Sequence, residues 1–419
     1  MTAVQTLSGR RRLSQAELDL CIEGHERFLK GRPGGRRASL RFMDFSGLDL
    51  SQRDLTDADL SASIFNGARM IRTKLERANL FGCDLRKADL RQAILIRADL
   101  RGCCLRGANL SQADLTQADF REGQVAVPHP RKGLSVITHE KRAGEADGAN
   151  FSGATLDGSQ FGGASAFAAD FSDCSLRGAK MTGANLKDAN LSGAIMDGAD
   201  VSGANLEGAN LRGAMLTGVN TVNARMSGAR LEGALQSPSA AAIAKVPDLL
   251  DMAMGNQSWC ETGGQNGKPA RFDGEDLRPI GDRFKGLRLT AASARGACLA
   301  GLNLSGSHLQ GANLEGANLR GACLFRADLR GAKLAGADLT KADLRGALLG
   351  VLPLGPGRSN PASLSQAKLR YVTAQSCDLT SAVLDGADMR GADLTGAKME
   401  QASMRDVDLA QIIGLIAGI

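Results

Sequence analysis

The sequence predicts an all-β solenoid, in which the chain winds into coils that stack on one another. A small residue stands two positions before each member of a regular apolar series, as Ala78 stands before Leu80 and Cys103 before Leu105. The series places an apolar side chain at every fifth position without a gap: Leu75, Leu80, Leu85, Leu90, Leu95, Leu100, Leu105, Leu110, Leu115 and Phe120.

A five-residue period fits neither a helix nor a flat strand. On an α-helix, five residues turn the chain by about 500°, which scatters successive leucines around the cylinder. On a strand, an odd period sends successive leucines to opposite faces. The pattern is satisfied if the chain turns a corner once per repeat, because the small residue and the leucine then share one interior. Glycine two positions after the leucine, as at Gly102 and Gly107, allows that turn without strain at Cβ.

The repeating units resemble those of the pentapeptide-repeat family, whose tandem units read A-D/N-L-x-x. Ala113-Asp114-Leu115-Thr116-Gln117 and Ala204-Asn205-Leu206-Glu207-Gly208 are two of them, and such units cover most of the chain. The resemblance implies a right-handed quadrilateral β-helix with four repeats in each coil. The spacing by itself indicates only the corner, so the number of sides and the handedness come from the family.

The first half is predicted to begin with an arm and a capping helix over 1–38, followed by a first solenoid over 39–235. The helix is expected at 14–30, since Ser14 and Glu17 fit a capping box and its apolar face would cover the open first coil. That face carries Leu18, Cys21, Ile22, His25, Phe28 and Leu29. Residues 123–147 lose the five-residue period and are predicted to project from the solenoid as a loop.

The second half is predicted to repeat this plan. Residues 236–271 would hold a second capping helix, with Asp248 as its cap. The stretch from Trp259 to Ala270 echoes that from Phe28 to Ala38 with one residue inserted, which indicates an internal duplication. A second solenoid is expected over 272–411, with regular apolar positions resuming at Phe284 and a loop at 351–362. Residues 412–419 form an apolar C-terminal tail.

Charge and cysteine content favour a bacterial, cytoplasmic protein. The 51 basic and 45 acidic side chains leave a mild basic excess in residues 1–38 (8 against 4) and 284–350 (9 against 4), which is typical of a solvated surface. Nine cysteines without CxxC spacing indicate reduced thiols. No apolar run approaches the ~20 residues of a membrane span, and Arg10-Arg11-Arg12 is not followed by the apolar segment of a signal peptide.

No catalytic, cofactor or metal site is predicted, so we do not expect an enzyme. His25 is expected to find partners beneath the capping helix, and His308 stands in an outward position. His129, His139 and Glu140 lie in the loop without the spacing of a metal site. The glycine-rich segment 31–35 lacks the ending of a phosphate-binding loop. Ala166, a weak inward residue, is expected to be compensated by Phe167. Outward Asp and Asn residues are expected to form structural ladders: Asp89, Asp99, Asn109, Asp114, Asn190, Asn205, Asp338 and Asp343.

The favoured function is a non-catalytic scaffold that binds another protein, whose identity is open. Some members of the family mimic DNA and occupy the DNA site of a type II topoisomerase (gyrase), and loop 123–147 resembles a loop of that group. A mimic needs an acidic face, whereas basic residues take outward positions here: Arg69, Arg72, Lys74, Arg77, Arg86, Lys87, Arg91, Arg97, Arg101 and Arg106. A nucleic-acid-binding solenoid would use these residues, but interleaved acids and the scarcity of exposed aromatics make nucleic acid an unexpected partner.

The apolar tail predicts either a cap or a contact with a second chain. Five large aliphatic residues follow Leu409, and soluble monomers rarely expose such a patch. One self-complementary patch is enough for a two-fold contact. Members of the family often pair through their C-terminal coils, so we expect a homodimer through this end.

Overall fold

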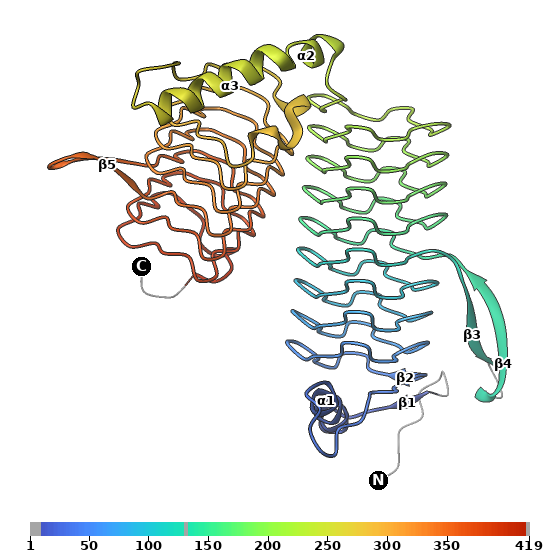
Figure 1. Cartoon of the computed structure of the whole chain (residues 1–419). Helices are drawn as coiled ribbons and strands as arrows, with labels where there is room; N and C mark the ends of the chain where they lie inside the picture. Colours follow the sequence, from blue (N-terminus) through green and yellow to red (C-terminus); the bar gives the residue numbers. More distant parts are fainter. Residues whose placement is uncertain (1–9, 130–132, 416–419) are drawn as a thin grey trace. The chain divides into compact units, whose positions relative to one another are not determined.

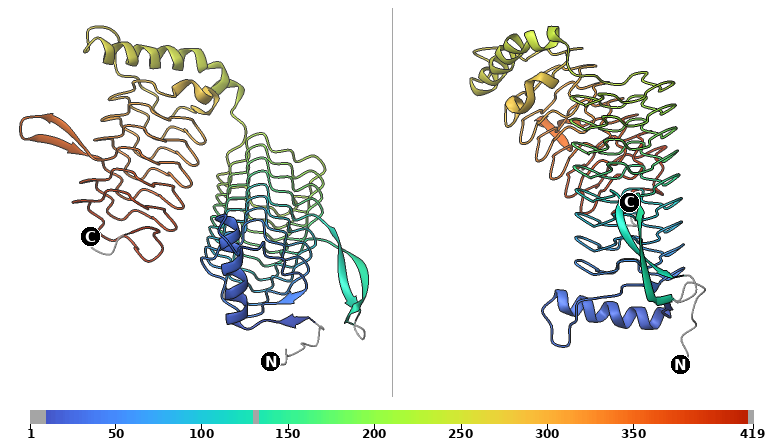
Figure 2. Two further views of the ribbon diagram at one scale, coloured as in Figure 1. Left: turned by 60° about the horizontal axis from the view of Figure 1, so that its bottom comes forward. Right: turned by 90° about the vertical axis from the view of Figure 1, so that its right-hand side faces the viewer.

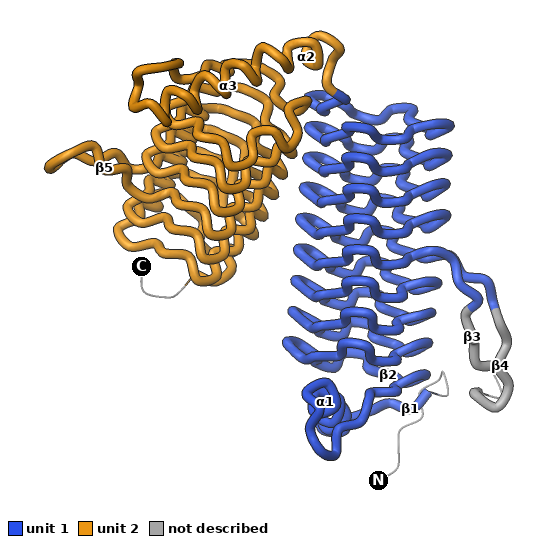
Figure 3. The backbone as a smooth tube through the Cα atoms, viewed as in Figure 1, with its two compact units in different colours: residues 1–237 blue, residues 238–419 orange. Residues whose placement is uncertain are grey.

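Each half of the chain folds into a stack of coils with a helix at its N-terminal end. Figure 1 shows the computed structural model, which describes residues 10–129 and 133–415. The chain divides into two compact units, Met1–Ser237 and Pro238–Ile419, coloured separately in Figure 3.

Parallel β-bridges between residues 20 apart hold successive coils together. Asp59 pairs with Asn79, Asn79 with Asp99, and Asp99 with Asp119. A step of 20 residues corresponds to four five-residue repeats in each coil, as the resemblance implied. The rows of short bridges are seen in Figure 1 as the stacked rungs of each unit.

Each corner of a coil is a tight turn closed by a backbone hydrogen bond. The N–H of Ala78 donates to the carbonyl of Leu75 at 3.0 Å, and the residue between them, Arg77, has a φ of 53°. Glycine adopts this left-handed conformation without strain, whereas other residues lose roughly 1–2 kcal/mol. At Arg77 the N–H also donates to Ile96 in the next coil at 2.9 Å, which helps to hold the turn.

The interior consists of the predicted leucines, alanines and a group of phenylalanines. Phe120 stacks on Phe161 with ring centroids 4.1 Å apart. The expected compensation at Ala166 is wrong, because Ala166 is buried whereas Phe167 points outward and is 42% exposed. Leu231, an inward position of the last coil in the first unit, is 38% exposed because no further coil of that unit follows it.

The N-terminal cap consists of a short strand and a helix. Strand β1 (Arg11–Arg12) pairs in parallel with β2 (Met43–Asp44). Helix α1 (Gln15–Leu29) begins with the predicted capping box, in which Glu17 N–H donates to Ser14 Oγ and Ser14 N–H donates to Glu17 Oε2. Its buried residues are Leu18, Ile22 and His25, so the expected packing of Cys21 and Phe28, both exposed, is wrong.

Two antiparallel hairpins leave the stacks at corners, as two views in Figure 2 show. Strands β3 (Gly123–His129) and β4 (Gly133–Arg142) form the first, and β5 (Val351–Gly355) and β6 (Arg358–Pro361) form the second. The stacking resumes after each one. Cys104 pairs with Glu145, 41 positions later, and Lys333 with Ser363, 30 positions later.

The second cap contains two helices, α2 (Ala240–Ala244) and α3 (Val246–Glu261). Lys245, not Asp248, is the N-cap of α3, and its side chain makes no capping hydrogen bond; Asp248 lies within the first turn instead. The first coil of this unit contains the 3₁₀ helix η1 (Arg278–Phe284) as one side. That coil is two residues longer than the regular coils of 20, since Asp276 pairs with Cys298.

The two caps are attached to their first coils by equivalent hydrogen bonds. Fully buried His25 accepts from Ala38 N–H at 3.0 Å, and its other ring nitrogen contacts the Thr56 carbonyl at 2.9 Å. Because a carbonyl only accepts, His25 is the neutral tautomer with its proton on Nε2. In the second unit, buried Asn256 accepts from Ala270 N–H at 2.9 Å and donates to the Thr290 carbonyl at 3.1 Å.

The C-terminal tail continues the coil as far as the structure describes it. Ile413 pairs with Asp393, and its N–H donates to Ala392 at 2.8 Å. Ile412 and Leu415 pack against the core of the second unit. Residues 416–419 of the predicted tail lie outside the described residues.

Inward and outward positions should respond differently to substitution. Ala204 is fully buried, so Ala204→Leu should overpack the coil and lower the free energy of unfolding by about 1–3 kcal/mol or more. Asn205, half-buried, accepts a hydrogen bond from Glu207 N–H and donates a long one to Asn185 Oδ1 at 3.4 Å, so Asn205→Ala should cost about 0.5–1.5 kcal/mol. Urea unfolding followed by circular dichroism measures both, and a larger loss for Asn205→Ala would contradict the inward–outward assignment.

The hydrogen bonds of the two caps predict that asparagine can partly replace histidine at position 25. His25→Ala leaves Ala38 N–H and the Thr56 carbonyl without their partner, at a cost of about 1–3 kcal/mol for each group that stays buried. His25→Asn should cost less, because an asparagine supplies both bonds at the equivalent position in the second unit. Urea unfolding of the three proteins tests this, with Asn256→Ala as the matched variant of the other cap. If His25→Asn and His25→Ala lose the same stability, the two caps are not equivalent.

Candidate binding surfaces

Acidic and amide side chains before the inward leucines bind the backbone of their own corner. Asp114 Oδ1 accepts from Thr116 N–H at 3.0 Å, and Asn210 Oδ1 accepts from Arg212 N–H at 3.3 Å. Some also bind along the stack, as Asn79 Nδ2 donates to Asp59 Oδ1 at 3.1 Å. These contacts give the predicted ladders a structural role, since Asp and Asn favour such turns.

Arginine after an inward residue pairs with the aspartate before it. Arg91 donates two hydrogen bonds to Asp89, with Nε–Oδ1 at 2.8 Å and Nη2–Oδ2 at 2.7 Å. The bidentate geometry is that preferred by guanidinium and carboxylate groups. The other pairs of this kind are Arg86–Asp84, Arg101–Asp99, Arg121–Asp119, Arg278–Asp276, Arg330–Asp328, Arg345–Asp343 and Arg390–Asp388.

Most basic residues predicted to point outward on the first unit already have acidic or amide partners. Arg72 donates to Gln92 and Arg97 donates to Gln117. Lys87 has neither kind of partner among the described residues. The ion pairs are Arg69–Asp49, Lys74–Asp54, Arg77–Asp57, Arg86–Asp84, Arg91–Asp89, Arg101–Asp99 and Arg106–Glu145. The first unit therefore presents alternating, internally compensated charge.

The pKa values of the carboxylates reflect this pairing. Partial burial raises the pKa of Asp328, but hydrogen bonds from Arg330 and its N–H lower it more, so the pKa lies below 3.8. Asp119 behaves in the same way beside Arg121. Hydrogen bonding to Asp84 raises the pKa of Arg86 above its ordinary value. The pKa values of Arg121 and Arg330 are raised by the same contacts, so the charged forms are favoured for both members of the Asp119–Arg121 and Asp328–Arg330 pairs.

Where the pKa of a cysteine is shifted, it is raised, so these thiols are not activated nucleophiles. Burial raises the pKa of Cys377 to about 12 and holds that of Cys103 well above its ordinary value. Both thiols stay protonated at neutral pH, whereas a nucleophilic cysteine needs a lowered pKa. None of the nine cysteines, all of which lie in the described residues, forms a disulfide.

The histidines lie in different parts of the fold, and for the two in the first hairpin the structure gives the backbone register. His25 is held between Ala38 and Thr56, as the sequence predicted. In the first hairpin, His129 pairs with Gly133 and His139 with Ala126, so the two histidines are not opposite each other in the register. Among the described side chains, no three His, Cys, Asp or Glu residues form a group that would hold a metal ion.

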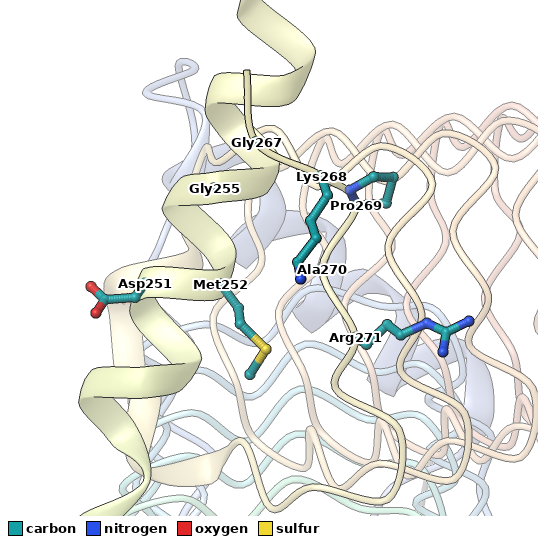
Figure 4. A pocket seen from close by; sticks show the side chains of 8 residues that line it. All are labelled: Asp251, Met252, Gly255, Gly267, Lys268, Pro269, Ala270 and Arg271. Atoms are coloured by element: carbon teal, nitrogen blue, oxygen red, sulfur yellow. The ribbon is translucent and has the colours of Figure 1, made fainter. Parts of the chain in front are cut away.

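A pocket that the sequence did not reveal lies beneath α3, with a volume of about 720 Å³. Figure 4 shows Met252 and Lys268 pointing into the space between α3 and the following chain, whereas Asp251 and Arg271 point away from it. Two glycines bring the walls together, because a Cβ on Gly267 would lie 2.0 Å from the Gly255 carbonyl. In the sequence, Gly255 and Gly267 are the residues that could have indicated this close approach of the two walls.

Three exposed apolar side chains of the second unit lie between residues 325 and 354 of the sequence. Phe325, Leu348 and Leu354 are 36%, 38% and 54% exposed. The second hairpin is seated on the stack by Asn360, whose Nδ2 donates to the Gly331 carbonyl at 2.8 Å. A Cβ on Gly331 would lie 2.7 Å from Leu352 Cβ, so glycine is needed there for the hairpin to lie this close.

The helices of the chain are short or polar. In residues 10–129 and 133–415, none has both the length and the apolar character needed to span a bilayer.

Comparison with known families identifies the repeat. The family model described as pentapeptide repeats, in eight copies, matches more than half of the chain. The chain therefore belongs to the pentapeptide-repeat family. The matched residues are 36–70, 44–82, 54–92, 93–124, 147–183, 169–208, 194–233, 288–324, 322–349, 362–401 and 375–411.

Solved structures with similarity to the chain include pentapeptide-repeat proteins. One from the cyanobacterium Cyanothece 51142 is 29% identical, covers 33% of this chain and 90% of its own, and gives a TM-score of 0.24. HetL from Nostoc sp. strain PCC 7120 is 20% identical over 93% of this chain and 94% of its own, with a TM-score of 0.17. Full-length QnrB1, a plasmid-mediated fluoroquinolone resistance protein, is 19% identical over 51% and 92%, with a TM-score of 0.25. No curated protein matches the chain.

The lowered carboxylate pKa values predict acid destabilisation. A pKa that is lower in the folded state contributes stability above the unfolded value of 3.8, and that contribution is lost as the pH falls through the folded value. Urea midpoints at pH 5, 4, 3 and 2 should therefore fall mainly below pH 4. Asp328→Asn should reduce the acid-dependent loss in the second unit, and an unchanged midpoint down to pH 2 would show that these ion pairs contribute no stability.

Proposed function

We propose that this pentapeptide-repeat protein is a non-catalytic scaffold that binds another protein through the second unit. The paired charges of the first unit disfavour recognition by charge there, so the exposed apolar side chains of the second unit are the observation that carries the proposal. Phe325, Leu348 and Leu354 are the contact residues that we propose, since exposed apolar groups of this size are typical of protein interfaces.

A DNA-mimicking modulator of gyrase is the less favoured alternative. A mimic of the phosphate backbone needs carboxylates that are open to the partner. Here Asp84, Asp89 and Asp99 are each bound by an arginine two residues away. A nucleic-acid-binding solenoid is disfavoured for a related reason. Its arginines would have to contact phosphates, but these arginines are already paired with the aspartates.

Several finer properties belong to the same proposal. We infer that each unit winds as a right-handed quadrilateral β-helix, following the family, and that the equivalent caps arose by internal duplication. The two solenoids would be residues 39–235 and 272–411. We place the protein in the bacterial cytoplasm, where its thiols stay reduced. We also propose that it forms a homodimer through the C-terminal end, where Ile412 and Leu415 are only partly buried.

Affinity capture with matched surface variants tests the scaffold function. Full-length protein carrying Phe325→Ser and Leu354→Ser should co-purify with at least about tenfold less of a protein partner than the unchanged protein does, because the apolar contacts are removed. Ile243→Ser removes an apolar side chain that is 56% exposed on α2 and should retain the partner.

The alternatives make opposite predictions in two direct assays. We expect no inhibition or protection of gyrase in a supercoiling assay at micromolar protein, and no gel shift of double-stranded DNA. Dose-dependent gyrase activity at nanomolar protein would overturn the scaffold in favour of the mimic, and a salt-sensitive gel shift would favour nucleic-acid binding.

A further inference from the structure

We propose that the cap of the second unit contains a binding site for a small planar carboxylate. A cavity of about 360 Å³ opens where the C-terminal end of α3 meets the first coils. Its walls include Trp259, Arg288, Thr290 and His308. The volume is at the lower end of the range for small-molecule sites. This site is separate from the protein-binding surface proposed above.

Two nitrogen-bearing side chains stand side by side on one wall. Arg288 and His308 are paired in the parallel register, so they occupy the same position in neighbouring coils about 4.8 Å apart. Neither forms an ion pair in the part of the chain that the structure describes. The next residue in the row is Asp328, whose Oδ2 already accepts from Arg330 at 2.7 Å and from Gln310 at 2.7 Å.

The indole ring of Trp259 is a further part of the lining, and its own loop holds it in place. The N–H of Gly264 donates to the Trp259 carbonyl at 2.8 Å, and a Cβ on Gly264 would lie 3.4 Å from Trp259 Nε1. Gly264 has a φ of 93°, which favours glycine and lets the loop pass along the edge of the indole. Thr262 closes the loop, accepting from Asn266 N–H at 2.9 Å.

The first unit shows what the same place looks like when it is closed. The equivalent hydrogen bonds of His25 and Asn256 align Thr56 with Thr290, and therefore Asp54 with Arg288 and Lys74 with His308. In the first unit Lys74 Nζ lies 3.7 Å from Asp54 Oδ2, so charge is compensated within the protein. The second unit has an arginine in place of that carboxylate.

The chemistry of the walls defines the ligand. A guanidinium group donates two parallel hydrogen bonds to a carboxylate. The Nδ1 atom of His308 accepts from Gln310 Nε2 at 3.5 Å, so its Nε2–H supplies the third donor. The indole face packs against a flat apolar group. An aromatic carboxylate satisfies both walls at once, with its carboxylate at Arg288 and His308 and its ring against Trp259.

Trp259 is the only tryptophan of the chain, so its fluorescence reports directly on the site. We expect benzoate, added to the full-length protein at fixed ionic strength, to change this fluorescence with saturation. Benzamide, its neutral counterpart, should bind at least about tenfold more weakly, since a hydrogen bond to a charged group contributes that much. Arg288→Gln should weaken benzoate binding by a similar factor.

Two further variants make the test decisive. Arg288→Asp combined with His308→Lys installs the ion pair of the first unit and should abolish the benzoate response while circular dichroism shows an intact fold. Arg326→Gln removes a cation that stacks on Phe325, 5.0 Å from its ring, and should leave the affinity unchanged. No saturable response to benzoate, equal binding of benzamide, or equal weakening by Arg326→Gln and Arg288→Gln would each overturn the proposal.

Discussion

The structure depends on one constraint, which is that each residue of a regular coil lies beside the residue 20 positions later. This register places like side chains in contact, which suits Ala and Leu in the interior. On the outside it would stack carboxylates on one another. Repulsion within such a row is avoided in two ways. Amides alternate with carboxylates, as in Asp59, Asn79 and Asp99, or an aspartate is paired with an arginine two residues away. Burial and surface charge are thus both set by the register.

The sequence predicts the regular part of this arrangement well, because one side chain in five is enough to mark the interior. It also predicts the start of α1, since Ser14 and Glu17 act locally. It could not place Cys21 and Phe28, because the face of α1 that is buried depends on how the helix lies on the first coil. Phe272 and Leu277 were not recognised as members of the regular apolar series, because η1 adds two residues between them and Leu289.

The candidate sites were hidden for a related reason. Trp259 and His308 are 49 residues apart, and nothing in either neighbourhood indicates a shared pocket until the register of the coils is known. The hydrogen bonds of the two caps were hidden as well, because His25 and Asn256 differ in residue type and agree only in what they donate and accept. Under the proposed duplication, backbone geometry was retained while the side chains at the rim diverged.

The hairpins show that position on the stack is independent of distance along the chain. Cys104 finds its partner after 41 residues instead of 20, and the coils on both sides keep their register. Lengthening a loop adds only a slowly growing closure entropy, about 0.6 kcal/mol for each doubling. A corner can therefore gain or lose a whole structural element without moving its neighbours. The number of the coil therefore fixes the height along the stack at which a hairpin, and any contact surface it carries, leaves the solenoid.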